Sequence, residues 1–179
     1  MAYGAIAPPS VLATLPILSF EIPDGSTVTT YPVHGREAPQ EVLEYLHGVF
    51  SVELASGTSY PQEGPMSLEA FIAYFFSSTT IVAIAGPAAN SLEEACRGKS
   101  AVESVTGCYY ISHNGGFIVP PSQRGRKIGV VLGKSFLQYA PKLGYRASVF
   151  NLVYKSRLKT GPGGEEEYVD AFVVYKSFV

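Results

Sequence analysis

Residues 114–133 read NGGFIVPPSQRGRKIGVVLG, and the rest of the chain is organised around these residues. Its apolar run 117–119 is typical of a strand, and the strand must end at Pro120. After a turn rich in glycine and basic residues, a helical pattern begins near Ile128. A strand, a turn and a helix start in this order direct unpaired backbone N–H groups and the positive end of a helix dipole towards an anion. The stretch therefore predicts a phosphate-binding site.

The length and composition fit one globular domain that can bury a core. The chain has 179 residues, of which 46% are hydrophobic, and this composition excludes a disordered protein. No apolar run reaches the roughly 18 residues of a membrane span. Residues 1–14 lack a basic segment and are broken by Pro8 and Pro9, so we expect a flexible N-terminal segment rather than a secretory signal. Cys96 and Cys108 have neither metal-ligand nor disulfide spacing, which predicts no metal site and an intracellular protein, in the cytoplasm or mitochondrion.

Charge is divided unevenly along the chain. Residues 1–122 hold 3 of the 13 Lys+Arg and 11 of the 15 Asp+Glu, whereas residues 123–179 hold 10 basic and 4 acidic residues. A basic region around a turn suits a small polyanion such as a nucleotide or a coenzyme. The acidic first part argues against nucleic acid as a partner, and no basic-aromatic module is present. The absence of a long apolar run argues against a membrane partner.

Hydrophobic periodicity predicts strands and helices in both halves of the chain. Residues 87–103 are polar and rich in alanine, and we expect a surface loop there. Residues 147–154 (ASVFNLVY) are nearly all apolar, which indicates a strand buried on both faces. The order of elements predicts an α+β fold, an α/β mixed sheet with helices on both faces. The expected strands are 15–22, 27–32, 79–85, 105–111, 117–119, 147–154 and 168–179, and the expected helices are 39–54, one capped by Ser67, and 127–140.

Several motifs together resemble a known family. The run Arg124–Gly129 (RGRKIG) is similar to the coenzyme A loop of the GNAT superfamily of N-acetyltransferases, with Lys127 where the middle glycine usually stands. The wider pattern looks like the fungal proline-analogue-resistance acetyltransferases, in which lysine also replaces that glycine. This resemblance covers about Leu15 to Val179 and implies a single N-acetyltransferase-like domain over residues 1–179. It is carried by SGTSYPQ (56–62), NGGF (114–117), YAPKLGY (139–145), VFNLVY (149–154) and YVDA (168–171).

The resemblance implies a GNAT-like fold and an activity. The activity is the acetyl-CoA-dependent N-acetylation of a small amino or imino acid, such as a proline analogue or a proline-pathway intermediate. In this family the amine attacks the thioester directly in a ternary complex. The small acceptor is then the partner, and the sequence allows a homodimer.

The resemblance also implies a coenzyme site. The backbone amides of the turn would hold the pyrophosphate, Arg124 and Arg126 would add charge, and Gly125 would let the backbone approach the ligand closely. The strand before the turn would run beside the pantetheine. The candidate coenzyme residues are Phe117, Ile118, Val119, Arg124, Gly125, Arg126, Lys127, Ile128 and Gly129.

Two asparagines are the candidate catalytic residues. Asn151 is polar inside an apolar strand, and an unpaired buried amide costs roughly 1–3 kcal/mol, so it needs a partner. By resemblance, Asn151 binds the substrate nitrogen and Asn114 the substrate carboxylate. The alternatives are a structural amide for Asn151 and an ordinary Asn-Gly turn for Asn114. The substrate pocket would also take Tyr154, Glu53 and Tyr60.

The sequence departs from the superfamily after the buried strand. A helix and a further strand normally follow there, and residues 155–167 are too few for both, so this segment is shortened. The alternative function is therefore a catalytically silent acyl-CoA-binding or scaffold protein with a GNAT-like fold. A third hypothesis is a regulatory nucleotide-binding module that prefers ATP.

Overall fold

A computed structural model of the chain describes residues 15–34, 37–56, 60, 64–112, 115–153 and 171–178, without the side chains of 151–153 and 171–174. The segment 1–14, expected to be flexible, and the shortened segment 155–167 lie outside the described residues. None of the helices in the described ranges is long and apolar enough to cross a bilayer.

Five strands form an antiparallel sheet in the order β1-β2-β3-β4-β5, and two further strands, β6 and β7, pair as an antiparallel ribbon. This is the α+β fold predicted from the sequence, with every pairing among the described strands antiparallel. The strands are β1 (Leu18–Glu21), β2 (Thr27–His34), β3 (Thr79–Ala85), β4 (Val105–Tyr110), β5 (Gly116–Ile118), β6 (Ala147–Val153) and β7 (Ala171–Ser177). The helices are α1 (Gln40–Ser56), α2 (Leu68–Phe75), α3 (Leu92–Cys96), α4 (Ala101–Ser104) and α5 (Ile128–Lys142), with one turn of 3-10 helix at Pro121–Gln123.

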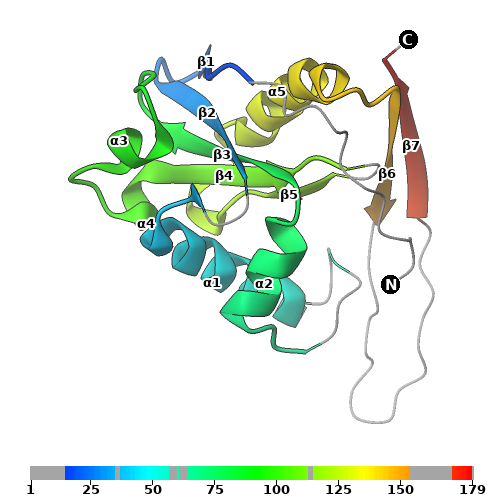
Figure 1. Cartoon of the computed structure of the whole chain (residues 1–179), viewed down its shortest axis with the longest axis horizontal. Helices are drawn as coiled ribbons and strands as arrows, with labels where there is room; N and C mark the ends of the chain where they lie inside the picture. Colours follow the sequence, from blue (N-terminus) through cyan, green and yellow to red (C-terminus); the bar gives the residue numbers. More distant parts are fainter. Residues whose placement is uncertain are drawn as a thin grey trace.

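Helices cover both faces of the five-stranded sheet (Figure 1). One core lies under α1 and α2, where Leu46, Phe50 and Phe71 are fully buried. The other lies under α5, where Leu132 and Phe136 pack on β4. Figure 1 also shows the β6–β7 ribbon at the opposite side of the molecule from α3 and α4.

The predicted helices form for the predicted reasons. The apolar residues of α1 recur with helical spacing and are buried against the sheet. Ser67 caps α2, since its side chain accepts a hydrogen bond from the N–H of Ala70 at 3.1 Å. The β-branched run Thr79–Ala85 is β3, as expected, and it is the central strand of the sheet.

The prediction of a surface loop over residues 87–103 is wrong. Two short helices, α3 and α4, occupy it. Ser91 accepts from the N–H of Glu94, and Ser100 and Glu103 form a reciprocal capping box. These helices are too short to show a hydrophobic stripe, so their signal lies in the caps rather than in the periodicity.

The prediction that 147–154 is buried on both faces is also wrong for its described side chains. In β6, Ser148 is 1% exposed but Val149 is 39% exposed, and opposite it in β7 Tyr175 is 64% exposed. The ribbon packs one face on α5 through Phe150, whose ring centroid lies 5.2 Å from that of Phe136. Its other face carries Val149 and Tyr175. An apolar run does not distinguish this arrangement from a fully buried strand.

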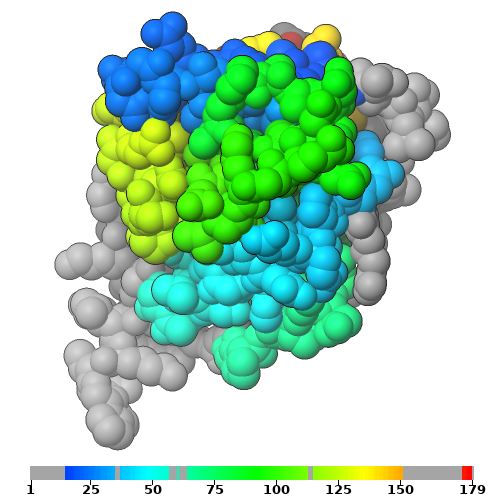
Figure 2. Space-filling model, turned by 90° about the vertical axis from the view of Figure 1, so that its left-hand side faces the viewer, coloured from blue at the N-terminus to red at the C-terminus, as the bar shows by residue number. Residues whose placement is uncertain are grey.

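The strand directions bring three segments to one end of the sheet. Because the pairings are antiparallel, the β1–β2 turn at residues 22–26, the end of β5 and the start of α5 all lie at this end. Figure 2 looks at the side of the molecule where the blue N-terminal hairpin and the yellow-green segment before α5 lie next to each other. The segment that the sequence marks for phosphate binding therefore lies beside the first hairpin.

Candidate active site

The turn before α5 presents a row of backbone N–H groups. Gly125 has φ +82° and Lys127 has φ +65°, so the chain takes two left-handed residues within three positions. In the part of the chain that the structure describes, no hydrogen bond to a protein acceptor is found for the N–H groups of 125–129. The first donors of the helix are Val130 and Val131, both to the carbonyl of Lys127. Such consecutive unpaired donors form an anion-binding concavity.

The electrostatics of this helix start also favour an anion. The first turn of α5 contains no acidic residue, and no side chain caps it. A ligand with negative charge would satisfy the N–H groups that other helices of this chain satisfy with Ser67, Ser91 or Ser100. The residues present therefore fit a pyrophosphate.

Both arginines of the turn contact carboxylates. Arg124 forms an ion pair with Glu53 of α1, and its Nε donates to the carbonyl of Val119 at 3.2 Å. Arg126 forms an ion pair with Asp24 in the β1–β2 turn at 3.0 Å. Each arginine thus ties the turn to a different part of the fold.

The edge of β5 is contacted from the α1 side. The hydroxyl of Tyr60 donates to the carbonyl of Phe117 at 3.0 Å, and the ring of Tyr60 packs edge-on against Phe50 with centroids 4.8 Å apart. Burial raises the pKa of the Tyr60 phenol, so Tyr60 remains a neutral donor. The structure thereby brings the predicted pocket residues Glu53 and Tyr60 to the strand and turn predicted to bind the coenzyme.

Two glycines at the start of β5 are closely packed against aromatic rings. A Cβ on Gly116 would lie 2.3 Å from Cε1 of Tyr110, and one on Gly115 would lie 3.1 Å from the rings of Phe117 and Phe136. The Tyr110 ring therefore lies directly against the backbone of Gly116, its partner across the strands. The Tyr110 hydroxyl lies 3.1 Å from that of Tyr74, which fixes the ring from the α2 side.

The remaining candidate residues are described in part or not at all. Asn151 lies in β6 opposite Val173, and its side chain is outside the described part of the structure. Asn114 and Tyr154 lie outside the described residues. The roles assigned to these three residues, and to the coenzyme residues 117–119 and 124–129, stay predictions.

Sequence reasoning missed the residues that hold the turn. Asp24, Ser26 and Gln123 all bond to Arg126. Gln123 directly precedes the run Arg124–Gly129, whereas Asp24 and Ser26 belong to no recognisable motif. One signal in the sequence could have pointed to Asp24. It stands in an Asp-Gly-Ser stretch typical of turns, and no basic residue stands beside it in the sequence. Its partner lies 102 positions away, and nothing in the sequence links the two.

Cys108 of β4 is a core residue. It is 0% exposed, and burial raises the pKa of its thiol, so it stays protonated and inert.

Comparison with known proteins finds acetyltransferases. The N-acetyltransferase aca1 of Schizosaccharomyces pombe is 30% identical over 173 residues, covering 78% of this chain and 81% of the relative. A GCN5-related N-acetyltransferase from Kribbella flavida matches the fold with a TM-score of 0.55 at 16% identity, over 83% of this chain and 97% of its own. The acetyltransferase yncA of Salmonella typhimurium, solved with its cofactor acetyl-CoA, matches the fold with a TM-score of 0.57 at 9% identity. The match covers 84% of this chain and 94% of yncA. No family model matches the chain.

Proposed function

Because this chain belongs to the GNAT superfamily of N-acetyltransferases, we propose that it transfers acetyl from acetyl-CoA to the amine of a small amino or imino acid. Proline analogues and proline-pathway intermediates are the acceptor class. The observation that carries the proposal is the row of unpaired N–H groups at 125–129, which follows the edge strand β5 after the 3-10 turn Pro121–Gln123.

The pyrophosphate of the coenzyme would bind at this row of amides. Five consecutive donors at a helix start supply hydrogen bonds and dipole charge together. Lys127 is exposed and adds a mobile positive charge beside them. Arg124 is 54% exposed and lies at the other side of the turn.

The pantetheine arm would pair with the outer edge of β5. A Cβ on Gly107 would lie 2.9 Å from the carbonyl oxygen of Ile118, so that carbonyl faces β4. Backbone groups alternate along an antiparallel strand, and those of Phe117 and Val119 therefore face outwards. Arg124 and Tyr60 donate to these two carbonyls, which are acceptors that pantetheine amides would use.

The chemistry follows from an amine placed beside this edge. The amine nitrogen forms a bond to the thioester carbonyl carbon, the carbon–sulfur bond breaks, the nitrogen loses a proton and the departing thiolate gains one. The outward N–H of Phe117 is the donor that would polarise the thioester carbonyl. The remaining contribution of the protein is orientation of two bound substrates. We assign Asn151 to the substrate nitrogen and Asn114 to its carboxylate, with Glu53, Tyr60 and Tyr154 around them.

The test follows free thiol after the protein is mixed with acetyl-CoA and azetidine-2-carboxylate. We expect thiol release that depends on both substrates, and release at the background rate would reject transfer to this acceptor class. An Asn151→Ala change should lower turnover far more than coenzyme affinity, and equal losses of both would contradict the role of Asn151.

The shortened segment 155–167 favours one alternative, a GNAT-like protein that binds acyl-CoA without turnover. Calorimetry with CoA separates the two. CoA binding without thiol release from acetyl-CoA in the presence of azetidine-2-carboxylate or other small amines supports the silent protein, whereas binding with release supports the enzyme.

A further inference from the structure

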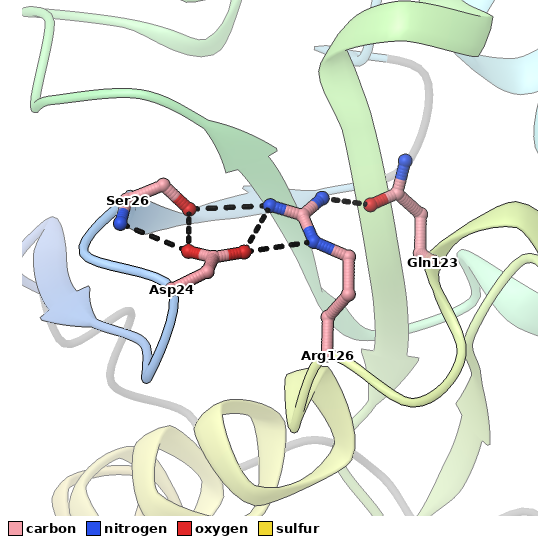
Figure 3. Close-up of polar contacts among 4 residues, drawn as sticks. All are labelled: Asp24, Ser26, Gln123 and Arg126. Atoms are coloured by element: carbon pink, nitrogen blue, oxygen red, sulfur yellow. Dashed lines mark hydrogen bonds and ion pairs between the residues drawn. The ribbon is translucent and has the colours of Figure 1, made fainter.

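A network of hydrogen bonds joins the first hairpin to the turn before α5 (Figure 3). Nε and Nη2 of Arg126 donate to Oδ2 of Asp24 at 3.2 and 3.0 Å, and Nη2 also donates to Oγ of Ser26 at 3.2 Å. Nη1 donates to Oε1 of Gln123 at 2.6 Å. One guanidinium therefore links the hairpin to both ends of the segment 123–126.

The carboxylate in this network is held from its own side as well. Oδ1 of Asp24 accepts from the N–H of Ser26 at 2.9 Å and from its hydroxyl at 2.5 Å. Gly25, at φ +81°, permits the tight turn that places Ser26 there. The bonds from Ser26, followed by the bond from Arg126, lower the pKa of Asp24 to about 2. Asp24 is thus a fixed, charged acceptor near neutral pH.

These contacts leave Arg126 poorly suited to bind phosphate. All three of its nitrogens are engaged, and a carboxylate neutralises its charge. The same contacts fix the backbone just before Lys127, where the chain must take a left-handed residue before the amides of 125–129 can converge. The network therefore acts on the shape of the turn rather than on its charge.

We propose that Asp24 is a positioning residue for the coenzyme, because with Ser26 it holds Arg126 and thereby keeps the turn 123–129 in its pyrophosphate-binding shape. This inference rests on the proposed function. Arg126 then has a structural role, instead of the direct phosphate contact that the sequence predicts.

The two roles of Arg126 predict opposite signs for one substitution. If Arg126 binds phosphate, then Asp24→Asn frees a guanidinium and removes a nearby negative charge, and both changes tighten coenzyme binding. If Arg126 positions the turn, then Asp24→Asn loosens the turn and weakens binding. Preorganising one such loop is expected to be worth about three- to tenfold in affinity.

The experiment measures CoA affinity by calorimetry, and KM and kcat for acetyl-CoA. It compares three variants: the single changes Asp24→Asn and Arg126→Lys, and the double change that combines Asp24→Asn with Arg126→Gln. We expect each to weaken CoA binding about three- to tenfold, with the double change no worse than the single ones. KM for acetyl-CoA should rise by the same factor while kcat stays unchanged. Arg126→Lys keeps the positive charge but loses the bidentate contact with Asp24, so its effect on CoA affinity reports the geometry of the contact and not its charge. Glu21→Gln removes the same charge from an exposed position of the hairpin and should leave binding unchanged.

Hydrogen exchange of the free protein is the second measurement. The amides of Val130 and Val131, which donate to the carbonyl of Lys127, should exchange faster in Asp24→Asn than in the wild type, without any ligand. Tighter CoA binding in Asp24→Asn, or full affinity in Arg126→Lys, would overturn the inference and leave the proposed function intact. A wild-type protein that does not bind CoA would overturn both.

Discussion

At the scale of single residues, Lys127 combines a structural cost with a charge. It is the only non-glycine residue with positive φ in the described ranges, and it stands where related coenzyme loops usually have glycine. A left-handed conformation costs a residue with a Cβ roughly 1–2 kcal/mol. We propose that the exposed ammonium group of Lys127, which would add positive charge beside the free amides, offsets this cost.

We therefore expect Lys127→Gly to stabilise the fold and weaken coenzyme binding. Relief of the left-handed strain, less the larger chain entropy of an unfolded glycine, should raise the free energy of unfolding by roughly 0.5–1 kcal/mol. CoA affinity should fall severalfold because one cation is lost. Urea unfolding and calorimetry measure the two effects.

Lys127→Ala is the matched control, because it removes the charge and keeps the Cβ. It should weaken CoA binding as much as Lys127→Gly without stabilising the fold. If both variants keep wild-type affinity, Lys127 does not contact the coenzyme.

At the scale of elements, the β1–β2 turn and the turn before α5 are coupled through the ion pair between Asp24 and Arg126. Asp24 has a folded pKa of about 2, below its unfolded value of 3.8, so the folded state holds its proton less tightly. Its contribution to stability is therefore complete above pH 3.8 and is lost as the pH falls towards 2. The difference in unfolding free energy between the wild type and Asp24→Asn should shrink across this window.

Urea unfolding of both proteins from pH 5 to pH 2 checks this dependence. The lowered pKa values of Glu94 and Glu103 act equally in both proteins and cancel in the difference. A difference that stays constant with pH would mean that Asp24 stabilises the turn without its charge.

The edge of β5 provides a second prediction at this scale. Tyr60→Phe removes the hydrogen bond to the carbonyl of Phe117 and keeps the ring against Phe50. The free energy of unfolding should fall by about 0.5–1.5 kcal/mol. CoA affinity should hold or rise, because a competitor of the pantetheine amides is gone. A clear loss of affinity would show instead that the Tyr60 hydroxyl contacts the coenzyme.

Not every element could be read from the sequence. Helices α1 and α5 were predictable because their buried residues repeat with helical spacing, and strand β3 because it is a continuous run of β-branched and apolar residues. The short helices α3 and α4 were not, because caps rather than periodicity define them. The contacts of Arg124 with Glu53 and of Arg126 with Asp24 join residues 71 and 102 positions apart, so only the folded chain reveals them.

At the scale of the whole molecule, an aromatic cluster centred on Phe136 joins the sheet to the ribbon, and within it Phe117 of β5 also lies 5.9 Å from Phe150 of β6. Phe136 of α5 lies 5.7 Å from the rings of Tyr109 and Phe117 on the sheet side. On the ribbon side it lies 5.2 Å from Phe150 and 6.3 Å from Phe178. A two-stranded ribbon is marginally stable alone, so this cluster holds β6 and β7 in place.

Phe136→Ala should cost about 3–5 kcal/mol of unfolding free energy and release the ribbon. Hydrogen exchange should accelerate in β6 and β7 more than in β3. Leu137→Ala is the control on the same helix, since Leu137 is 47% exposed, and it should cost less than about 0.5 kcal/mol. Equal acceleration in β3 and the ribbon would mean that the two unfold as one unit.

Acetyl transfer from acetyl-CoA to a small amine is followed with acetyl-CoA that carries an isotopic label in its acetyl group. The protein is incubated with acetyl-CoA labelled in the acetyl group and with azetidine-2-carboxylate, and the acceptor is analysed by mass spectrometry. We predict that the label appears on the ring nitrogen in proportion to enzyme and time, and that Asn151→Ala suppresses it. An acceptor that stays unlabelled, under conditions where calorimetry shows the coenzyme bound, would mean that the protein does not acetylate this acceptor.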